Sequence, residues 1–231
     1  MAQWLSSLCR AKIPVYLGCI SILLSEPSIS GELLELAVRE KEGEYSLRIV
    51  VVMNAPADYV YQVITDYRNA YRINPAITSV KILPAERDDV TRVVSRSTHY
   101  VGMFAFEIEW AGDVVERRRQ RIDMTTVPKY SSFESGFSLW EISPQGDQTW
   151  VLHESTLKPK FFVPPLIGTY LVKKHMNNEA LTTFHHIECH ARSKLERDMQ
   201  ADPKPLKVAM KKEKDCVDAR RYEAGQIPVK R

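Results

Sequence analysis

Glycine is scarce in this chain, with nine residues in 231, and no segment carries a glycine-rich phosphate-binding loop or a dinucleotide fingerprint. No serine lies in a nucleophile elbow that would precede the acid and histidine of a hydrolase. The most apolar stretch near the N-terminus, residues 13–24, is too short to cross a bilayer comfortably. These absences argue against nucleotide-dependent enzymes and serine hydrolases, and they leave a globular chain without a familiar catalytic signature.

The small net charge of +3 is unevenly distributed. Residues 192–231 carry a net charge of +5, residues 1–30 carry +1, and the body between them is slightly acidic. Nucleic-acid binding is not expected, because a duplex-binding surface needs a basic stripe. The basic C-terminal segment could contact anionic lipid or RNA, but such segments are usually solvated, so only weak contact with a membrane surface is expected.

The N-terminus has the pattern of a secretory signal. Basic residues precede the apolar run 13–24, and Ser28 and Ser30 place small side chains at positions −3 and −1 of a cleavage before Gly31. We therefore expect an exported, periplasmic protein. The alternatives are an N-terminal membrane anchor that is not cleaved and a cytoplasmic protein.

The four cysteines are compatible with export. Cys9 and Cys19 would be removed with a signal peptide, whereas Cys189 and Cys216 would remain as an even pair in an oxidising compartment. A disulfide between these two would join the last helix to the tail. The alternative is two unrelated thiols.

Apolar residues alternate along several segments, which is typical of half-buried strands. The predicted strands are residues 44–53, 77–83, 90–100, 103–110, 117–127, 131–143 and 148–157. A short helical region follows the first strand, and a long helix is predicted from about Pro165 to Glu196. The expected organisation is a signal peptide or anchor at 1–30, one domain at 31–197, and a flexible basic tail at 198–231.

The order of elements predicts an α+β helix-grip fold, in which a curved antiparallel sheet wraps around the long C-terminal helix. The helix is the only predicted element large enough to cover one face of such a sheet, and the space between them is a natural ligand site. The segment KFFVPPLIG, residues 160–168, joins the last strand to the helix. Pro164 and Pro165 would stiffen this joint, while Phe161 and Phe162 would lie at the cavity mouth or fill the core.

The chain resembles the START-like (SRPBCC) superfamily over about residues 45–195. The resemblance rests on the strand–turn–helix segment 51–61, on residues 66–67 and 71–75, and on the helix that begins with proline. Within the superfamily it is most similar to the polyketide cyclase/dehydrase and coenzyme Q-binding branch. The resemblance implies an apolar cavity for a lipid, isoprenoid quinone or polyketide-like ligand. An export signal and a basic tail are not typical of that branch.

We therefore expect a monomer that binds or carries a hydrophobic small molecule, without catalytic residues, metal or cofactor. The side chains expected to line the cavity are Phe104, Phe106, Trp110, Phe133, Phe137, Phe162, Tyr170 and Phe184. One alternative is an enzyme of the cyclase/dehydrase type that uses a histidine or glutamate of the cavity. Another is a module that contacts protein or RNA, related to the ribosome-association toxin of the same branch.

The segment His185–His190 contains the clearest metal-ligand spacing, because His186 and His190 share a helix face. No third ligand is evident, so a structural role is favoured. Glu109 should face away from the aromatic side of its strand. His99 and His153 lie on strands, where either could point inward as a polar anchor for a ligand.

Overall fold

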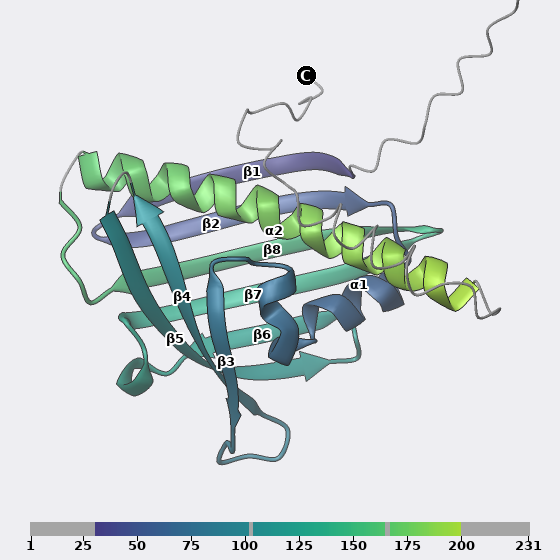
Figure 1. The fold of residues 1–231 in the computed structure, drawn as a ribbon, viewed down its shortest axis with the longest axis horizontal. Coiled ribbons are helices and arrows are strands. Elements are labelled where there is room, and N and C mark those ends of the chain that lie inside the picture. Colours follow the sequence, from purple (N-terminus) through teal and green to yellow (C-terminus); the bar gives the residue numbers. More distant parts are fainter. Residues whose placement is uncertain (1–30, 102–103, 165–166, 200–231) are drawn as a thin grey trace, which may run out of the picture.

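The computed structural model describes residues 31–101, 104–164 and 167–199 (Figure 1). Its strands are β1 (Glu32–Lys41), β2 (Glu44–Met53), β3 (Ile77–Leu83), β4 (Thr91–Val101), β5 (Phe104–Arg117), β6 (Arg121–Thr126), β7 (Phe133–Gln145) and β8 (Gln148–Pro159). Its helices are α1 (Ala57–Ile64), the short 3-10 helices η1 (Tyr67–Arg72) and η2 (Pro128–Tyr130), and α2 (Ile167–Met199).

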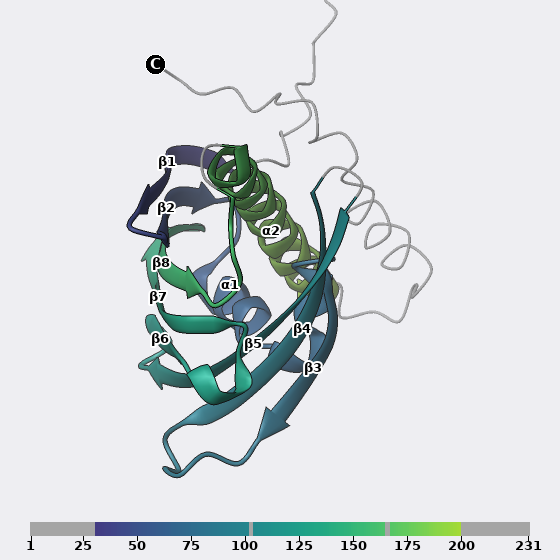
Figure 2. The same cartoon turned by 90° about the vertical axis from the view of Figure 1, so that its left-hand side faces the viewer.

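The strands form one antiparallel sheet in the order β1-β2-β8-β7-β6-β5-β4-β3. Each strand from β3 to β7 pairs with the next along the chain, as a meander does, and β2 pairs with β8. The sheet curves around α2, which crosses its concave side, and α1 lies beside the helix (Figures 1 and 2). The predicted helix-grip fold is confirmed.

Strand β1 was not predicted from the sequence. It is an edge strand with charged residues at both ends, and its register shifts between Leu33 and Glu35, so its apolar alternation is interrupted. Charges and irregularities of this kind protect an exposed edge from pairing with another chain. The turn into β2 has positive φ angles at Glu42 and Gly43, which suits a two-residue hairpin.

The predicted strand 117–127 also needs correction. Strand β5 extends to Arg117, and the chain then turns through Arg118 and Arg119, whose φ angles are 51° and 56°. β6 therefore begins only at Arg121. Because glycine or asparagine usually marks such a turn, two arginines in the left-handed region gave no signal in the sequence.

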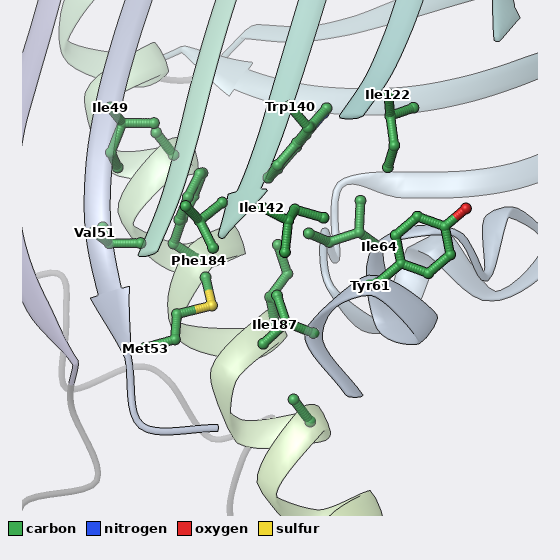
Figure 3. Packing of buried hydrophobic residues seen from close by; sticks show 14 of the residues in the cluster. Ile49, Val51, Met53, Tyr61, Ile64, Ile122, Trp140, Ile142, Phe184 and Ile187 are labelled. Atoms are coloured by element: carbon green, nitrogen blue, oxygen red, sulfur yellow. The ribbon is translucent and has the colours of Figure 1, made fainter. Parts of the chain in front are cut away.

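The hydrophobic core lies between the concave face of the sheet and α2 (Figure 3). Ile49 from β2, Ile142 from β7 and Ile187 from α2 are essentially inaccessible to water. The core residues of the helices come from α1 and from the part of α2 between Ala180 and Ala191. None of the described helices is long and apolar enough to cross a membrane.

Candidate ligand site and polar cluster

A cavity of about 1060 Å³ lies where α2 begins, beside the β1–β2 hairpin and the end of β8. Its apolar lining comes from Tyr45, Pro159, Phe161, Phe162, Val163 and Tyr170. Its polar lining comes from Glu40, Gly43, Lys158, Thr169, Lys173, Lys174, Asn177 and Asn178. The volume is slightly above the usual range for small-molecule pockets, about 300–1,000 Å³.

Two of the expected lining residues, Phe162 and Tyr170, border this cavity with 81% and 65% of their surface exposed. Phe161 turns back toward β7 and meets the Phe133 ring edge-on, 6.3 Å between centroids. A side chain at position 168 would come within 2.9 Å of Pro164 Cδ, so Gly168 lets the incoming segment pack closely against the helix start. Phe161 thus contacts the sheet and also borders the cavity, whereas Phe162 borders the cavity alone.

A second aromatic surface lies on the concave side of β4 and β5. Phe106 is the cross-strand partner of His99, whose ring reaches α2, so both side chains point inward. Trp110 lies further along the same face, packs against the core, and donates from Nε1 to Thr126 Oγ1 at 3.2 Å. Its ring covers Gly112, where a Cβ would lie 2.2 Å from the indole.

The remaining expected lining residues lie elsewhere. Phe133 and Phe184 are buried, and Phe184 stacks on Trp140 in the core (Figure 3). Phe137 lies on the outer face of the sheet, because it is three residues before the inward-facing Trp140 in the regular part of β7. The register shift between Phe133 and Ser135 places Phe133 on the opposite face to Phe137. The side chain of Phe104 lies outside the part of the chain that the structure describes. We therefore leave Phe137 and Phe184 out of the proposed ligand site.

A polar cluster joins β4 to the first half of α2. His99 Nδ1 lies 2.8 Å from His175 Nε2, and Glu179 Oε2 lies 3.2 Å from His175 Nε2 and 3.6 Å from His99 Nδ1. The sequence had marked His99 as a possible inward anchor but missed the other two. The sequence does contain evidence for this pair, because His175 and Glu179 lie one turn apart on the same face of the predicted helix.

Burial and mutual contacts set the charges of this cluster. Burial lowers the pKa of His99, although the nearby Glu179 carboxylate acts in the opposite direction. Burial alone would raise the pKa of Glu179, but hydrogen bonds from His175 and Asn74 and the charge of His99 together hold it below its usual value. The cluster therefore favours an ionised Glu179 carboxylate beside a neutral His99 imidazole.

Two histidines of the segment His185–His190 form hydrogen bonds with neighbouring backbone. His186 Nδ1 donates to the Ile73 carbonyl and His190 Nε2 donates to the Arg72 carbonyl, each at 3.2 Å. Both bonds fasten α2 to the end of η1, which supports the structural role favoured by the sequence. Cys189 is disulfide-bonded, whereas the expectation that Cys216 is its partner falls outside the described residues.

Two other candidates occupy clearly different surroundings. Glu109 lies on the outer face of β5 and forms a salt bridge to Arg96 at 2.6 Å, as expected for a solvated carboxylate. His153 points inward, stacks on Trp140 at 4.1 Å and donates from Nδ1 to the Leu139 carbonyl. Burial lowers the pKa of His153 to about 4, so its imidazole is neutral at physiological pH.

A curved sheet that grips a long helix, with an aromatic cavity at the helix start, defines a START-like domain. The chain belongs to the polyketide cyclase/dehydrase and lipid transport family, whose sequence model matches residues 53–174. This confirms the START-like resemblance and its cyclase/dehydrase branch.

Solved structures show the same fold. The Zhui aromatase/cyclase from a Streptomyces species has a TM-score of 0.55 and 15% identity, over 66% of this chain and 96% of that protein. A STAR-related lipid transfer protein from Xanthomonas axonopodis has a TM-score of 0.54 and 17% identity, over 70% and 98% of the two chains. Among curated protein sequences no significant match was found. At these identities the likeness concerns the fold, and the activity must be argued from this chain's own residues.

Proposed function

We propose that this domain binds and carries a hydrophobic small molecule, such as a lipid, an isoprenoid quinone or a polyketide-like compound, in the cavity at the start of α2. The observation that carries the proposal is the exposure of Phe162 and Tyr170 on a cavity of about 1060 Å³. Large apolar side chains that line a hollow surface commonly mark a binding site. The family also includes lipid-transport proteins, which supports the same proposal.

The polar side of the cavity narrows the ligand class. Lys173 and Lys174 lie one helical turn beyond Thr169 and Tyr170, and Asn177 and Asn178 extend the same face of α2. A ligand with an apolar body and an anionic or strongly polar end would satisfy both sides. Each 100 Å² of apolar ligand surface removed from water contributes about 2.5 kcal/mol.

Tyr170→Ala is expected to weaken binding of the polyene fatty acid cis-parinaric acid by about tenfold or more. The substitution removes an aromatic contact, and a loss of about 1.4 kcal/mol corresponds to a tenfold change in Kd. Tyr100→Ala is the matched control. Tyr100 is 70% exposed and follows the inward-facing His99, so its side chain lies on the outer face of β4.

Fluorescence titration of the two variants and the parent protein measures the effect. The control is expected to bind within about twofold of the parent, because less than 0.5 kcal/mol is typical of surface substitutions. Equal affinity in both variants would show that the ligand does not occupy this cavity. Native mass spectrometry of protein from its own cells would then identify what, if anything, co-purifies.

The cyclase/dehydrase activity is a second candidate, favoured by the cluster of His99, His175 and Glu179 between sheet and helix. Neither Glu109 nor His153 suits acid–base chemistry, since one lies on the outer face and the other in the core. The two functions differ in the fate of the ligand. A carrier returns it unchanged, whereas a dehydrative cyclase releases a product lighter by one water, which mass spectrometry of the extracted ligand distinguishes. The third alternative, protein or RNA contact through the tail, concerns residues almost entirely outside the described ranges.

We also propose export, with cleavage before Gly31. Besides the signal pattern, the proposal is supported by the position of the Gly31 nitrogen, which donates to Glu188 Oε2 at 2.6 Å. Burial raises the pKa of Glu188, whose other oxygen accepts from the Asn54 N–H at 3.1 Å. A new α-ammonium group at Gly31 would supply this buried carboxylate with a positive partner.

Ser30→Tyr is expected to block processing, because signal peptidase requires a small residue at position −1. Ser25→Tyr is the control, since it changes a serine of the same segment away from the two small positions. Intact mass spectrometry of the periplasmic fraction should show a chain that begins at Gly31 for the parent and for the control. An intact chain 1–231 in the parent, found in the cytoplasm or the membrane, would contradict the proposal.

A further inference from the structure

The cluster of His99, His175 and Glu179 brings three metal-type ligand atoms to one point. His99 is on β4, and the other two residues lie one turn apart on α2, so strand and helix supply the ligands from opposite sides. The Nδ1, Nε2 and Oε2 atoms form a triangle with edges of 2.8, 3.2 and 3.6 Å. No charged lysine or arginine forms a salt bridge with this carboxylate among the pairs found in the described residues.

These dimensions suit a metal ion. Zinc binds histidine nitrogen and carboxylate oxygen at about 2.0–2.2 Å, and a tetrahedral arrangement then separates neighbouring ligand atoms by about 3.3 Å. The three edges bracket this value. An ion above the triangle would reach all three atoms with little movement of the side chains. We propose that His99, His175 and Glu179 form a binding site for one divalent transition-metal ion, with Zn²⁺ as the representative.

The neighbouring polar groups hold these ligands in orientation. His99 Nε2 lies 2.7 Å from Ser97 Oγ, which leaves Nδ1 directed at the cluster. Asn74 Nδ2 donates to Glu179 Oε1 at 2.6 Å, which leaves Oε2 directed at the same point. Hydrogen bonds to the outer atoms of ligating histidines and carboxylates are a regular feature of metal sites, where they fix the ring and the tautomer.

The site is closed on most sides but remains accessible. The His99 side chain is 11% exposed, Glu179 is 26% exposed and His175 is 33% exposed. Phe106, the cross-strand partner of His99, borders it with an apolar ring. Three protein ligands leave a fourth position, which suits water or an oxygen of a bound ligand, as in catalytic rather than structural zinc sites. A metal here would bind and polarise a ligand carbonyl or carboxylate.

Direct titration of the full chain tests the proposal. The protein is treated with EDTA, its free thiols are alkylated to exclude cysteine binding, and Zn²⁺ is added in a calorimeter. One ion per chain is the expected stoichiometry. Co²⁺ in place of Zn²⁺ is expected to give visible d–d bands without a sulfur-to-metal charge-transfer band, since nitrogen and oxygen are the ligands.

Matched variants assign the site. His175→Gln and Glu179→Gln are each expected to weaken Zn²⁺ affinity by at least about 100-fold, and Asn74→Ala by about tenfold, because outer partners contribute less than ligands. His185→Gln removes a histidine from the same helix outside the cluster and is expected to bind like the parent. Circular dichroism confirms that each variant is folded.

Two results would overturn the proposal. The first is the absence of saturable Zn²⁺ binding, which would leave the cluster as a hydrogen-bonded proton network. The second is equal affinity in the parent, His175→Gln and Glu179→Gln, which would locate the metal elsewhere on the chain. Fatty acid binding at the cavity is measured separately. A chain that binds the fatty acid but not Zn²⁺ contradicts only the metal site, and the reverse contradicts only the proposed function.

Discussion

Phe184→Ala is expected to lower the free energy of unfolding by about 3–5 kcal/mol, the range for truncation of a buried phenylalanine. The side chain is only 5% exposed, and its ring stacks on Trp140 with 5.3 Å between centroids (Figure 3). Its loss would leave a void between α2 and β7 that the strands on either side cannot close. Because domains of this size are stable by about 5–15 kcal/mol, such a loss is a large share of the total.

Urea denaturation followed by circular dichroism measures this difference, with Phe162→Ala as the control. Phe162 is 81% exposed, so its truncation is expected to change stability by less than about 0.5 kcal/mol. The pair separates two roles that the sequence could not distinguish, since both phenylalanines were expected to line the cavity. A loss below about 1 kcal/mol for Phe184→Ala would indicate that its ring faces open space rather than a packed core.

The meander and the long helix were predictable because each leaves a clear period in the sequence. From residue 77 to residue 159, apolar residues recur every second position, and the sheet must bury the face that they form. Only α2 is long enough to cover that face. This is why Phe106 and Trp110 were correctly expected on the same side of β5, opposite to Glu109.

Register irregularities were not predictable by the same argument. Phe133 and Phe137 are four residues apart and would share a face on a regular strand, but the shift near Glu134 places them on opposite faces. The edge strand β1 has its own irregularity and a high content of charge, so its alternation is weak. Both features depend on how neighbouring strands pair, and a single segment does not contain that information.

The polar cluster depends on tertiary structure in another way. His175 and Glu179 are visible as a helical pair, but their third member is 76 residues away from His175 on β4. Only the crossing of α2 over the sheet brings His99 to them. The contiguous segment His185–His190 has the clearer metal-ligand spacing in the sequence, yet His186 and His190 bind backbone carbonyls at the end of η1.

His153 is expected to make the protein acid-sensitive. Its ring stacks on Trp140 and lies 6.3 Å from Phe184, where a charged imidazolium has poor solvation. Burial lowers its pKa to about 4, from 6.5 in an unfolded chain. The hydrogen bond to the Leu139 carbonyl acts in the opposite direction but does not compensate.

The sign of the effect follows from proton binding. The unfolded chain takes up a proton at this histidine as pH falls below 6.5, whereas the folded protein does so only near pH 4, so acid favours unfolding between these values. The contribution of His153 is therefore complete above pH 6.5 and is lost as pH falls to 4. With one pKa unit equal to about 1.4 kcal/mol, and allowing for the partial access of water, the loss amounts to about 2–3 kcal/mol.

His153→Phe is expected to remove this part of the pH dependence, because phenylalanine keeps a ring beside Trp140 and does not titrate. Unfolding free energies of parent and variant are measured by urea denaturation at several values between pH 7 and pH 4.5. The parent should lose more stability than the variant as pH falls, because only the parent has the His153 contribution to lose. The difference between the two proteins isolates His153 from the other titratable groups, which both proteins share. Parallel curves over the whole range would mean that His153 titrates alike in the folded and unfolded chains, and that its ring is not shielded from water by Trp140 and Phe184.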